Sequence, residues 1–184
     1  MGNRKSYRLF GILLAALIFS VDQLVKYVMT GPLALESRSV IHIMPFFDFR
    51  WTENHGISLG MLTADNDTQR WLLVGFTAFV AIIVTIWMLR EKLLGDVLAL
   101  AMVLGGALGN IVDRARLGYV LDYADLHFGT FRPFLIFNVA DACITIGVLI
   151  LLARAFMMRE KDTNSDEGEQ GPSAEKNNLE TENA

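Results

Sequence analysis

Residues 71–89 read Trp-Leu-Leu-Val-Gly-Phe-Thr-Ala-Phe-Val-Ala-Ile-Ile-Val-Thr-Ile-Trp-Met-Leu and include no charged side chain. A helix needs about 20 predominantly apolar residues to cross a bilayer, so this segment predicts a transmembrane helix. Three more stretches are comparable in length and apolar character, at residues 7–29, 93–112 and 134–157. The sequence therefore predicts an all-α membrane protein with four transmembrane helices.

The chain separates into a membrane part and a polar tail. It has 184 residues, 53% of them hydrophobic, and we expect one four-helix transmembrane domain at residues 1–158. Residues 159–184 hold eight acidic and three basic residues, so their net charge is −5 while the rest of the chain is near +1. Such a composition is typical of disorder, and we expect a disordered acidic cytoplasmic tail. Basic residues do not cluster among aromatics, so nucleic-acid binding is not expected.

Basic residues set the expected orientation. The first apolar stretch follows basic residues as a signal peptide does, but it lacks a small-x-small cleavage site, so we interpret it as a retained helix. Further basic residues fill the turn at 90–92 and follow the fourth helix at 154–161. With four spans these sites lie on one side, which the positive-inside rule assigns to the cytoplasm. Both termini are then cytoplasmic, and residues 30–70 and 113–133 form outward loops.

The outward loops carry the β-structure that we expect. Residues 40–51 are rich in Ile, Phe and other strand formers and are interrupted by Pro45, which predicts two short strands. The second loop includes Tyr119-Val-Leu-Asp-Tyr123, which we interpret as a short strand or an interfacial helix. The predicted fold is thus four helices with a small extracytoplasmic β-containing region.

Carboxylates beside apolar spans are the main indication of chemistry, since ionisable groups there are costly and usually face a polar interior. Asn110 precedes Asp113 by three residues, and Asn138 precedes Asp141 by three. On a helix this spacing stacks the two side chains on one face. If the fourth helix begins near residue 134, Asp141 lies about two turns, or about 10 Å, inside it. The simpler interpretation, that each Asp caps a helix or pairs with an arginine, stays open.

Two carboxylates at close range share a proton because both cannot ionise easily. The ionised partner can accept a proton from an attacking water, while the protonated partner polarises a peptide carbonyl. Asp113 and Asp141 are therefore candidates for an aspartyl protease pair, and which one is the base stays open. A proton-relay transporter and a scaffold without chemistry are the alternatives, although a relay needs polar groups along its whole path, which the charge-free span at 71–89 lacks.

Two polar motifs lie near these carboxylates in the predicted topology. Asp22 and Lys26 are four residues apart on the first helix, so they form either an internal salt bridge or a polar lip of the site. Asn54 and Gly56 lie in the long outward loop, where the glycine permits a turn and the amide can bind a peptide backbone.

Other features favour packing and argue against other protease classes. Gly105 and Gly109 form a small-residue step that allows close helix packing, which we expect to bring the two candidate aspartates together. The chain's histidines form no His-Glu-x-x-His pattern, so no metal site is expected. Gly56-Ile-Ser58-Leu-Gly60 has the Gly-x-Ser-x-Gly spacing, but it lies within the long outward loop and not at a predicted strand-to-helix turn, where a serine nucleophile of that kind is placed. The histidines are His42, His55 and His127.

Five motifs follow one another between residues 7 and 157. They are Asp22-Gln-x-x-Lys26, Asn54-x-Gly56 through Gly60, Gly105-Gly-Ala-Leu-Gly-Asn110-Ile-Val-Asp113-Arg114, Val120-Leu-Asp122-Tyr123 and Phe137-Asn138-Val-Ala-Asp141-Ala. Together they resemble the successive motifs of the signal peptidase II family. The family pattern has Ala-Phe-Gly where this chain has Ser58-Leu59-Gly60, and Phe where it has Tyr123, so the roles of these residues stay open.

The resemblance implies an aspartic endopeptidase of the bacterial inner membrane. It would cut diacylglyceryl-modified prolipoproteins just before the lipidated cysteine, near the periplasmic face, without a metal or organic cofactor. Asp113 and Asp141 would be the catalytic pair. We expect prolipoproteins and membrane lipids as partners, and a monomer. The residues implied to line or support the site are Asp22, Lys26, Asn54, Gly56, Asn110, Arg114 and Asn138.

Overall fold

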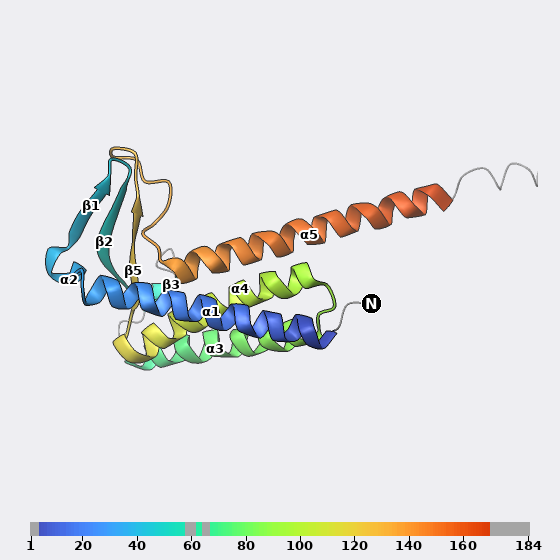
Figure 1. Ribbon diagram of the computed structural model, residues 1–184, viewed down its shortest axis with the longest axis horizontal. Helices are drawn as coiled ribbons and strands as arrows, with labels where there is room; N and C mark the ends of the chain where they lie inside the picture. The colour runs from blue at the N-terminus through green and yellow to red at the C-terminus, as the bar shows by residue number, and fades with distance from the viewer. Residues whose placement is uncertain (1–3, 58–61, 64–66, 170–184) are drawn as a thin grey trace, which may run out of the picture.

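Four long helices form the body of the protein in a computed structural model (Figure 1). The structure describes residues 4–57, 62–63 and 67–169. The long helices are α1 (Arg4–Thr30), α3 (Asp67–Arg90), α4 (Leu94–Leu117) and α5 (Val139–Glu169), and a single turn, α2 (Leu35–Arg38), follows α1. Each long helix contains a segment long and apolar enough to cross a membrane. The prediction of four spans is confirmed.

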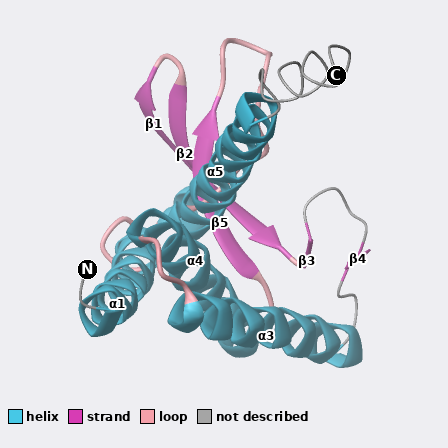
Figure 2. Cartoon of the chain, turned by 90° about the vertical axis from the view of Figure 1, so that its right-hand side faces the viewer, coloured by secondary structure: helices cyan, strands magenta, loops and turns pink. Residues whose placement is uncertain are grey.

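Helix α4 lies at the centre of the bundle. Figure 2 shows α1, α3 and α5 on different sides of it, and all three pack against it. Within the most apolar 18-residue segment of each helix, 56% is buried in α4, against 11–28% in the other three helices. The outer helices expose large apolar side chains such as Leu13, Phe76 and Leu149, as lipid-facing helices do. Residues that must be shielded from lipid are therefore best placed on α4.

Glycines on α4 allow two neighbouring helices to approach closely. A Cβ at Gly105 would lie 2.7 Å from the backbone oxygen of Ala15 on α1, and one at Gly109 would collide with the carboxyl group of Asp22. One at Gly106 would collide with the backbone oxygen of Ala140 on α5. The Gly105–Gly109 step thus packs against α1, and Gly106 rather than this step brings α5 close.

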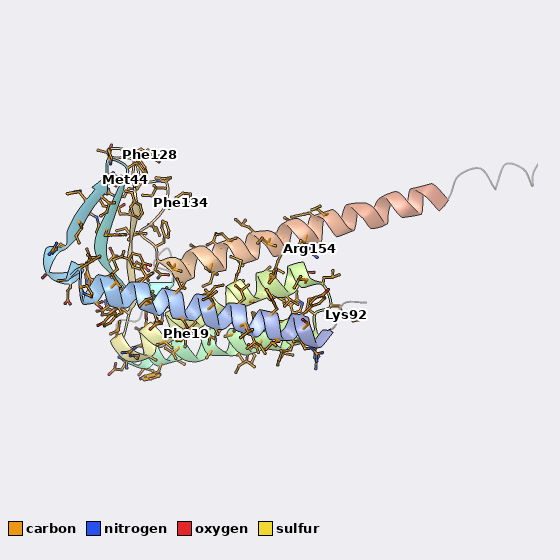
Figure 3. All side chains as sticks on the ribbon, in the orientation of Figure 1. Phe19, Met44, Lys92, Phe128, Phe134 and Arg154 are labelled. Atoms are coloured by element: carbon orange, nitrogen blue, oxygen red, sulfur yellow. The ribbon has the colours of Figure 1, made fainter. Side chains whose placement is uncertain are left out.

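A three-stranded antiparallel sheet covers one end of the bundle, in the order β1-β2-β5 (Figure 1). Its strands are β1 (Val40–Met44), β2 (Phe47–Asn54) and β5 (Val120–Leu126). The two strands predicted on either side of Pro45 are confirmed, and the segment at 119–123 forms a strand. Beyond β2, the short strands β3 (Gly56–Ile57) and β4 (Leu62–Thr63) pair with each other. Figure 3 shows Met44, Phe128 and Phe134 at the far tip of the sheet region, and Lys92 at the opposite end of the molecule.

Apolar packing fixes the sheet to the outer ends of α1 and α5. Met29 of α1 and Leu35 of α2 are buried in one cluster with Leu121 and Tyr123 of β5. The segment before α5 also pairs with β5, since the backbone N–H of Ala124 donates to the oxygen of Phe137 at 2.8 Å. The sheet and the start of α5 are therefore joined by backbone as well as by side chains.

The helix ends differ from the sequence-based expectations. Helix α4 continues beyond residue 112 to Leu117, where Gly118 ends it at a φ of 91°. Helix α5 begins at Val139 rather than near residue 134, because Phe137 pairs with β5 and Asn138 caps the helix. It continues to Glu169, past the expected boundary at residue 158, so the first part of the expected tail is helical. The expected disorder of 170–184 lies outside the described residues.

Candidate active site

The residues singled out from the sequence gather at the end of the bundle that carries the sheet. They come from α1, the end of β2, the start of β3, α4 and the start of α5, which meet there beside β5 (Figure 1). Most of them are buried, and Asn54 and Asp141 are half-buried. The buried members are Asp22, Lys26, Gly56, Asn110, Asp113, Arg114 and Asn138.

Lys26 connects α1 to α4 through its ammonium group. Its Nζ lies 2.8 Å from Oδ2 of Asp22 and 2.7 Å from Oδ2 of Asp113, and it donates to Oδ1 of Asn110 at 3.3 Å. These three partners match the three protons of a lysine ammonium. The expected Asp22–Lys26 salt bridge is present, and it also forms part of the site.

Asp113 is held by charge and by hydrogen bonds. Besides its ion pair with Lys26, its Oδ1 accepts from Nε2 of Gln23 at 3.0 Å and its Oδ2 accepts from the backbone N–H of Leu121 at 3.3 Å. Asp113 therefore fixes α1, α4 and β5 to one another.

Asp141 lies in the first turn of α5, not two turns inside it as its position in the sequence suggested. Its backbone N–H donates to Oδ1 of Asn138 at 2.9 Å, and its Oδ2 accepts from the N–H of Asn138 at 3.4 Å. This reciprocal pair has the arrangement of a capping box. The other carboxyl oxygen, Oδ1, accepts from Nδ2 of Asn110 at 2.8 Å. Asn138 thus orients Asp141 as the cap of its helix, while Asn110 holds it to α4.

Asp122 is a further acidic residue of the site, and it was not among the candidates taken from the sequence. Its Oδ1 accepts from Nδ2 of Asn138 at 2.6 Å, and its Oδ2 accepts from Nδ2 of Asn54 at 3.0 Å. Burial, followed by the nearby charge of Asp141, raises the pKa of Asp122 to about 7, although the two amide donors act in the opposite direction. The sequence signal was an isolated acid in the strand-like run Val-Leu-Asp-Tyr.

Asn138 joins Asp122 to Asp141. Its side-chain nitrogen donates to Asp122 and also to Oδ1 of Asn110 at 3.3 Å, while its side-chain oxygen caps Asp141. Asp141 and Asp122 therefore share Asn138, whereas Asp113 is linked to Asn138 through other groups: Asn110 with Lys26, and the backbone of Leu121. The shared amide places Asp122 beside Asp141.

Asn54 at the end of β2 and Gly56 at the start of β3 are attached to this cluster. Nη2 of Arg114 donates to the backbone oxygen of Gly56 at 2.8 Å, and the N–H of Gly56 donates to Oδ1 of Asn54 at 3.1 Å. The buried Nε of Arg114 has no hydrogen-bond partner among the described residues. Ser58, Leu59 and Gly60, where the chain departs from or continues the family motif, lie outside the described residues.

Tyr123 stands where the family pattern has Phe, and its additional hydroxyl group forms a hydrogen bond with the backbone of Val139. The side chain is buried, and its hydroxyl oxygen accepts from the backbone N–H of Val139 at 3.3 Å. Burial raises the pKa of this phenol above its ordinary value, so it stays neutral. The hydroxyl satisfies one of the N–H groups at the start of α5, where Asp22 accepts from the next one, that of Ala140, at 3.0 Å.

The histidines lie away from this cluster. Nδ1 of His42 and Nε2 of His127 lie 3.0 and 3.1 Å from the two carboxyl oxygens of Asp48 in the sheet, and His55 lies 3.4 Å from Glu53. Within the part of the chain that the structure describes, no three His, Cys, Asp or Glu side chains are grouped as metal ligands.

Comparisons with known proteins agree with this arrangement. The family model for signal peptidase (SPase) II matches residues 14–157. The chain is 56% identical to a lipoprotein signal peptidase of Sphingopyxis alaskensis over 163 residues, which cover 89% of this chain and 94% of that protein. It is 54% identical to a lipoprotein signal peptidase of Rhizorhabdus wittichii over 157 residues, or 85% of this chain and 91% of that one.

Solved structures of bacterial membrane enzymes have a similar fold. One matches with a TM-score of 0.70 at 25% identity and covers 85% of this chain and 90% of its own. A second matches with a TM-score of 0.67 at 26% identity and covers 79% of this chain and 92% of its own. The chain therefore belongs to the signal peptidase II family.

Proposed function

We propose that this chain is a membrane aspartic endopeptidase that removes the signal peptide from diacylglyceryl-modified prolipoproteins, cutting just before the lipidated cysteine. Membership of the signal peptidase II family supports a protease that acts on lipoprotein signal peptides. The observation that carries the aspartic mechanism is the placement of Asp122 beside Asp141 through the shared amide of Asn138. Burial, followed by the nearby charge of Asp141, raises the pKa of Asp122 to about 7.

The choice of Asp122 rather than Asp113 as the partner of Asp141 rests on the contacts of each carboxyl group. The motif spacing in the sequence favoured Asp113, but that side chain is ion-paired with Lys26 at 2.7 Å. Asp113 is linked to Asp141 through Asn110 and Lys26, whereas Asp122 shares the amide of Asn138 with Asp141. Burial and the nearby Asp141 raise the pKa of Asp122 to about 7, so this carboxyl group can hold the shared proton. In this proposal Asp113 supports the site and does not react.

The pair can perform peptide hydrolysis with one proton shared between its members. The ionised carboxylate accepts a proton from a water molecule as the water oxygen attacks the carbonyl carbon, and the protonated carboxyl donates a hydrogen bond to the carbonyl oxygen. The tetrahedral intermediate then breaks its C–N bond as the amine receives a proton from the pair. Since the pair titrates jointly, the roles of base and acid belong to the pair and not to one residue.

The position of the pair suits a substrate that is anchored in the membrane. Asp141 opens α5 and Asp122 lies on the strand next to it, so the reacting groups lie at the end of the spans rather than at their middle. A lipid-modified cysteine holds its peptide bond at that depth. Lys92 lies at the opposite end (Figure 3), which supports cytoplasmic termini and a periplasmic active site. In this proposal the enzyme acts as a monomer on prolipoproteins within the membrane.

A gel-shift cleavage assay tests this proposal. The purified chain in detergent would receive a prolipoprotein that already carries its diacylglyceryl group and, separately, the same substrate without the lipid. We expect cleavage of the lipidated form alone, and loss of cleavage in Asp122→Asn and in Asp141→Asn. Asp113→Asn should keep a measurable rate if it only supports the site. A folded wild-type chain that cuts neither substrate would refute the protease assignment.

A further inference from the structure

Asn54 lies at the end of β2, where the chain leaves the sheet, and its side chain contacts Asp122. Its Nδ2 donates to Oδ2 of Asp122 at 3.0 Å, and its Oδ1 accepts from the backbone N–H of Gly56 at 3.1 Å. A backbone N–H can only donate, so the amide oxygen of Asn54 must face Gly56 and the nitrogen must face Asp122. The direction of the hydrogen bond to Asp122 is therefore fixed by the backbone two residues further along.

The turn that orients Asn54 is itself held by the central helix. Nη2 of Arg114 on α4 donates to the backbone oxygen of Gly56 at 2.8 Å, so both backbone groups of Gly56 have partners. Arg114 is buried, with 8% of its surface exposed. A buried guanidinium with a short bond to a backbone oxygen restrains that backbone. The contacts thus run from Arg114 through Gly56 and Asn54 to one oxygen of Asp122.

We propose that Asn54 is a positioning residue that stabilises the ionised form of Asp122. It thereby sets the upper limit of the pH range in which the aspartate pair holds its single proton. This inference rests on the proposed function, in which Asp122 and Asp141 react together. An amide N–H that points at a carboxylate oxygen favours the charged form over the neutral one. Asn54 therefore limits the pH range over which Asp122 remains protonated.

The effect of Asn54 on the ionisation of Asp122 can be separated from the effects of the other groups that face Asp122, because those groups lie on different elements. Asp141 at the start of α5 opposes ionisation of Asp122, and Lys26 of α1 favours it. Arg114 of α4 lies in the field of both carboxyl groups. These residues and Asn138, which donates to the other oxygen, belong to helices or their caps. Asn54 is the donor supplied by the sheet end, so its removal leaves the helix-borne groups in place.

The test is the pH profile of kcat/KM for Asn54→Ala in the full-length chain in detergent, with the lipidated prolipoprotein as substrate. The alkaline limb of this profile reports loss of the shared proton from the free enzyme. Loss of a hydrogen bond to a charged acceptor should move that limb upward by about one pH unit. A substrate-binding or merely structural role would change the height of the profile and leave the limb in place, and that result would overturn the inference.

His55→Ala is the matched control, because His55 is the neighbouring exposed residue and pairs with Glu53 rather than with Asp122. Its alkaline limb should coincide with that of the wild type. The variant Asp122→Asn distinguishes a failure of the proposed function from a failure of the proposed role of Asn54. If that variant cleaves normally, the proposed function fails. If it is inactive while Asn54→Ala keeps the wild-type limb, only the role of Asn54 fails.

An infrared titration gives a readout that does not depend on turnover. The carbonyl stretch of the protonated Asp122 carboxyl is identified as the band present in the wild type and missing in Asp122→Asn. In Asn54→Ala this band should persist to a pH about one unit higher than in the wild type. A band that disappears at the wild-type pH would overturn the inference even if Asn54→Ala has lost its cleavage activity.

Discussion

Substituting Gly106 by alanine should separate α4 from the start of α5 and thereby disturb the aspartate cluster. The added Cβ would collide with the backbone oxygen of Ala140 and lie 2.8 Å from Cγ1 of Ile144, where 3.4–4 Å is ordinary contact. A backbone oxygen cannot rotate away, so α5 must move by about 1 Å at this point. The hydrogen bond from Asn110 to Asp141, now 2.8 Å, would then exceed the usual range for such bonds.

The consequences for activity and for stability differ in size. A misplacement of about 1 Å in a reacting group costs about 100-fold in rate, so we expect at least that loss of cleavage. Overpacking costs about 1–3 kcal/mol, and alanine regains about 1 kcal/mol over glycine within a helix, so the net loss of stability should stay below about 2 kcal/mol. Gly106→Ala should therefore be folded but nearly inactive.

The assay compares cleavage of the lipidated prolipoprotein with thermal unfolding in the same detergent. Gly75→Ala is the control, because Gly75 lies on α3 and a Cβ there meets nothing within 4 Å. That variant should cleave like the wild type and be at least as stable. Wild-type cleavage by Gly106→Ala would refute the argument that close packing of α5 sets the geometry of the site. An equal loss in Gly75→Ala would assign the effect to any added methyl group.

Three further outcomes are expected. Lys26→Met should destabilise the chain by about 3–5 kcal/mol, because it leaves two buried carboxylates without their ammonium partner, and a lowered Tm with lost cleavage checks this. Tyr123→Phe should cost about 1 kcal/mol in unfolding free energy, because the N–H of Val139 loses its acceptor, while kcat changes little. The folded-state pKa of Asp122, about 7, lies above its ordinary 3.8, so the folded chain binds more protons between these values. Its contribution to stability is therefore present at low pH and lost as pH rises towards 7, by up to about 1.4 kcal/mol per pH unit, and the Tm difference between wild type and Asp122→Asn should show this slope.

Hydropathy was sufficient to find the four spans, because a bilayer imposes a minimum apolar length on any helix that crosses it. It could not find their ends, which depend on contacts of individual residues. Gly118 ends α4 in a left-handed conformation, and this stop signal was present in the sequence beyond the apolar run. The start of α5 depends on the pairing of Phe137 with β5, which joins segments that no local pattern relates.

The membership of the site was less predictable than its location. The Asn-x-x-Asp motif forms two different local structures in this chain. Asn110 and Asp113 lie on one face of α4, whereas Asn138 and Asp141 form the N-terminal cap of α5. A search for acidic residues beside apolar helices does not select Asp122, because this residue lies on the strand β5. Its role depends on desolvation and on the neighbouring Asp141, and both arise only when the sheet covers the bundle.

The distribution of these residues along the chain has a consequence for biosynthesis. Asp22 and Lys26 belong to the first span, and Asp141 with its cap belongs to the start of the last one. A nascent chain that has inserted only three spans therefore lacks Asp141, one of the two carboxyl groups that we propose to react. In the proposed mechanism the chain becomes proteolytic only when its final helix has entered the membrane, so an incompletely translated copy cannot cut a substrate.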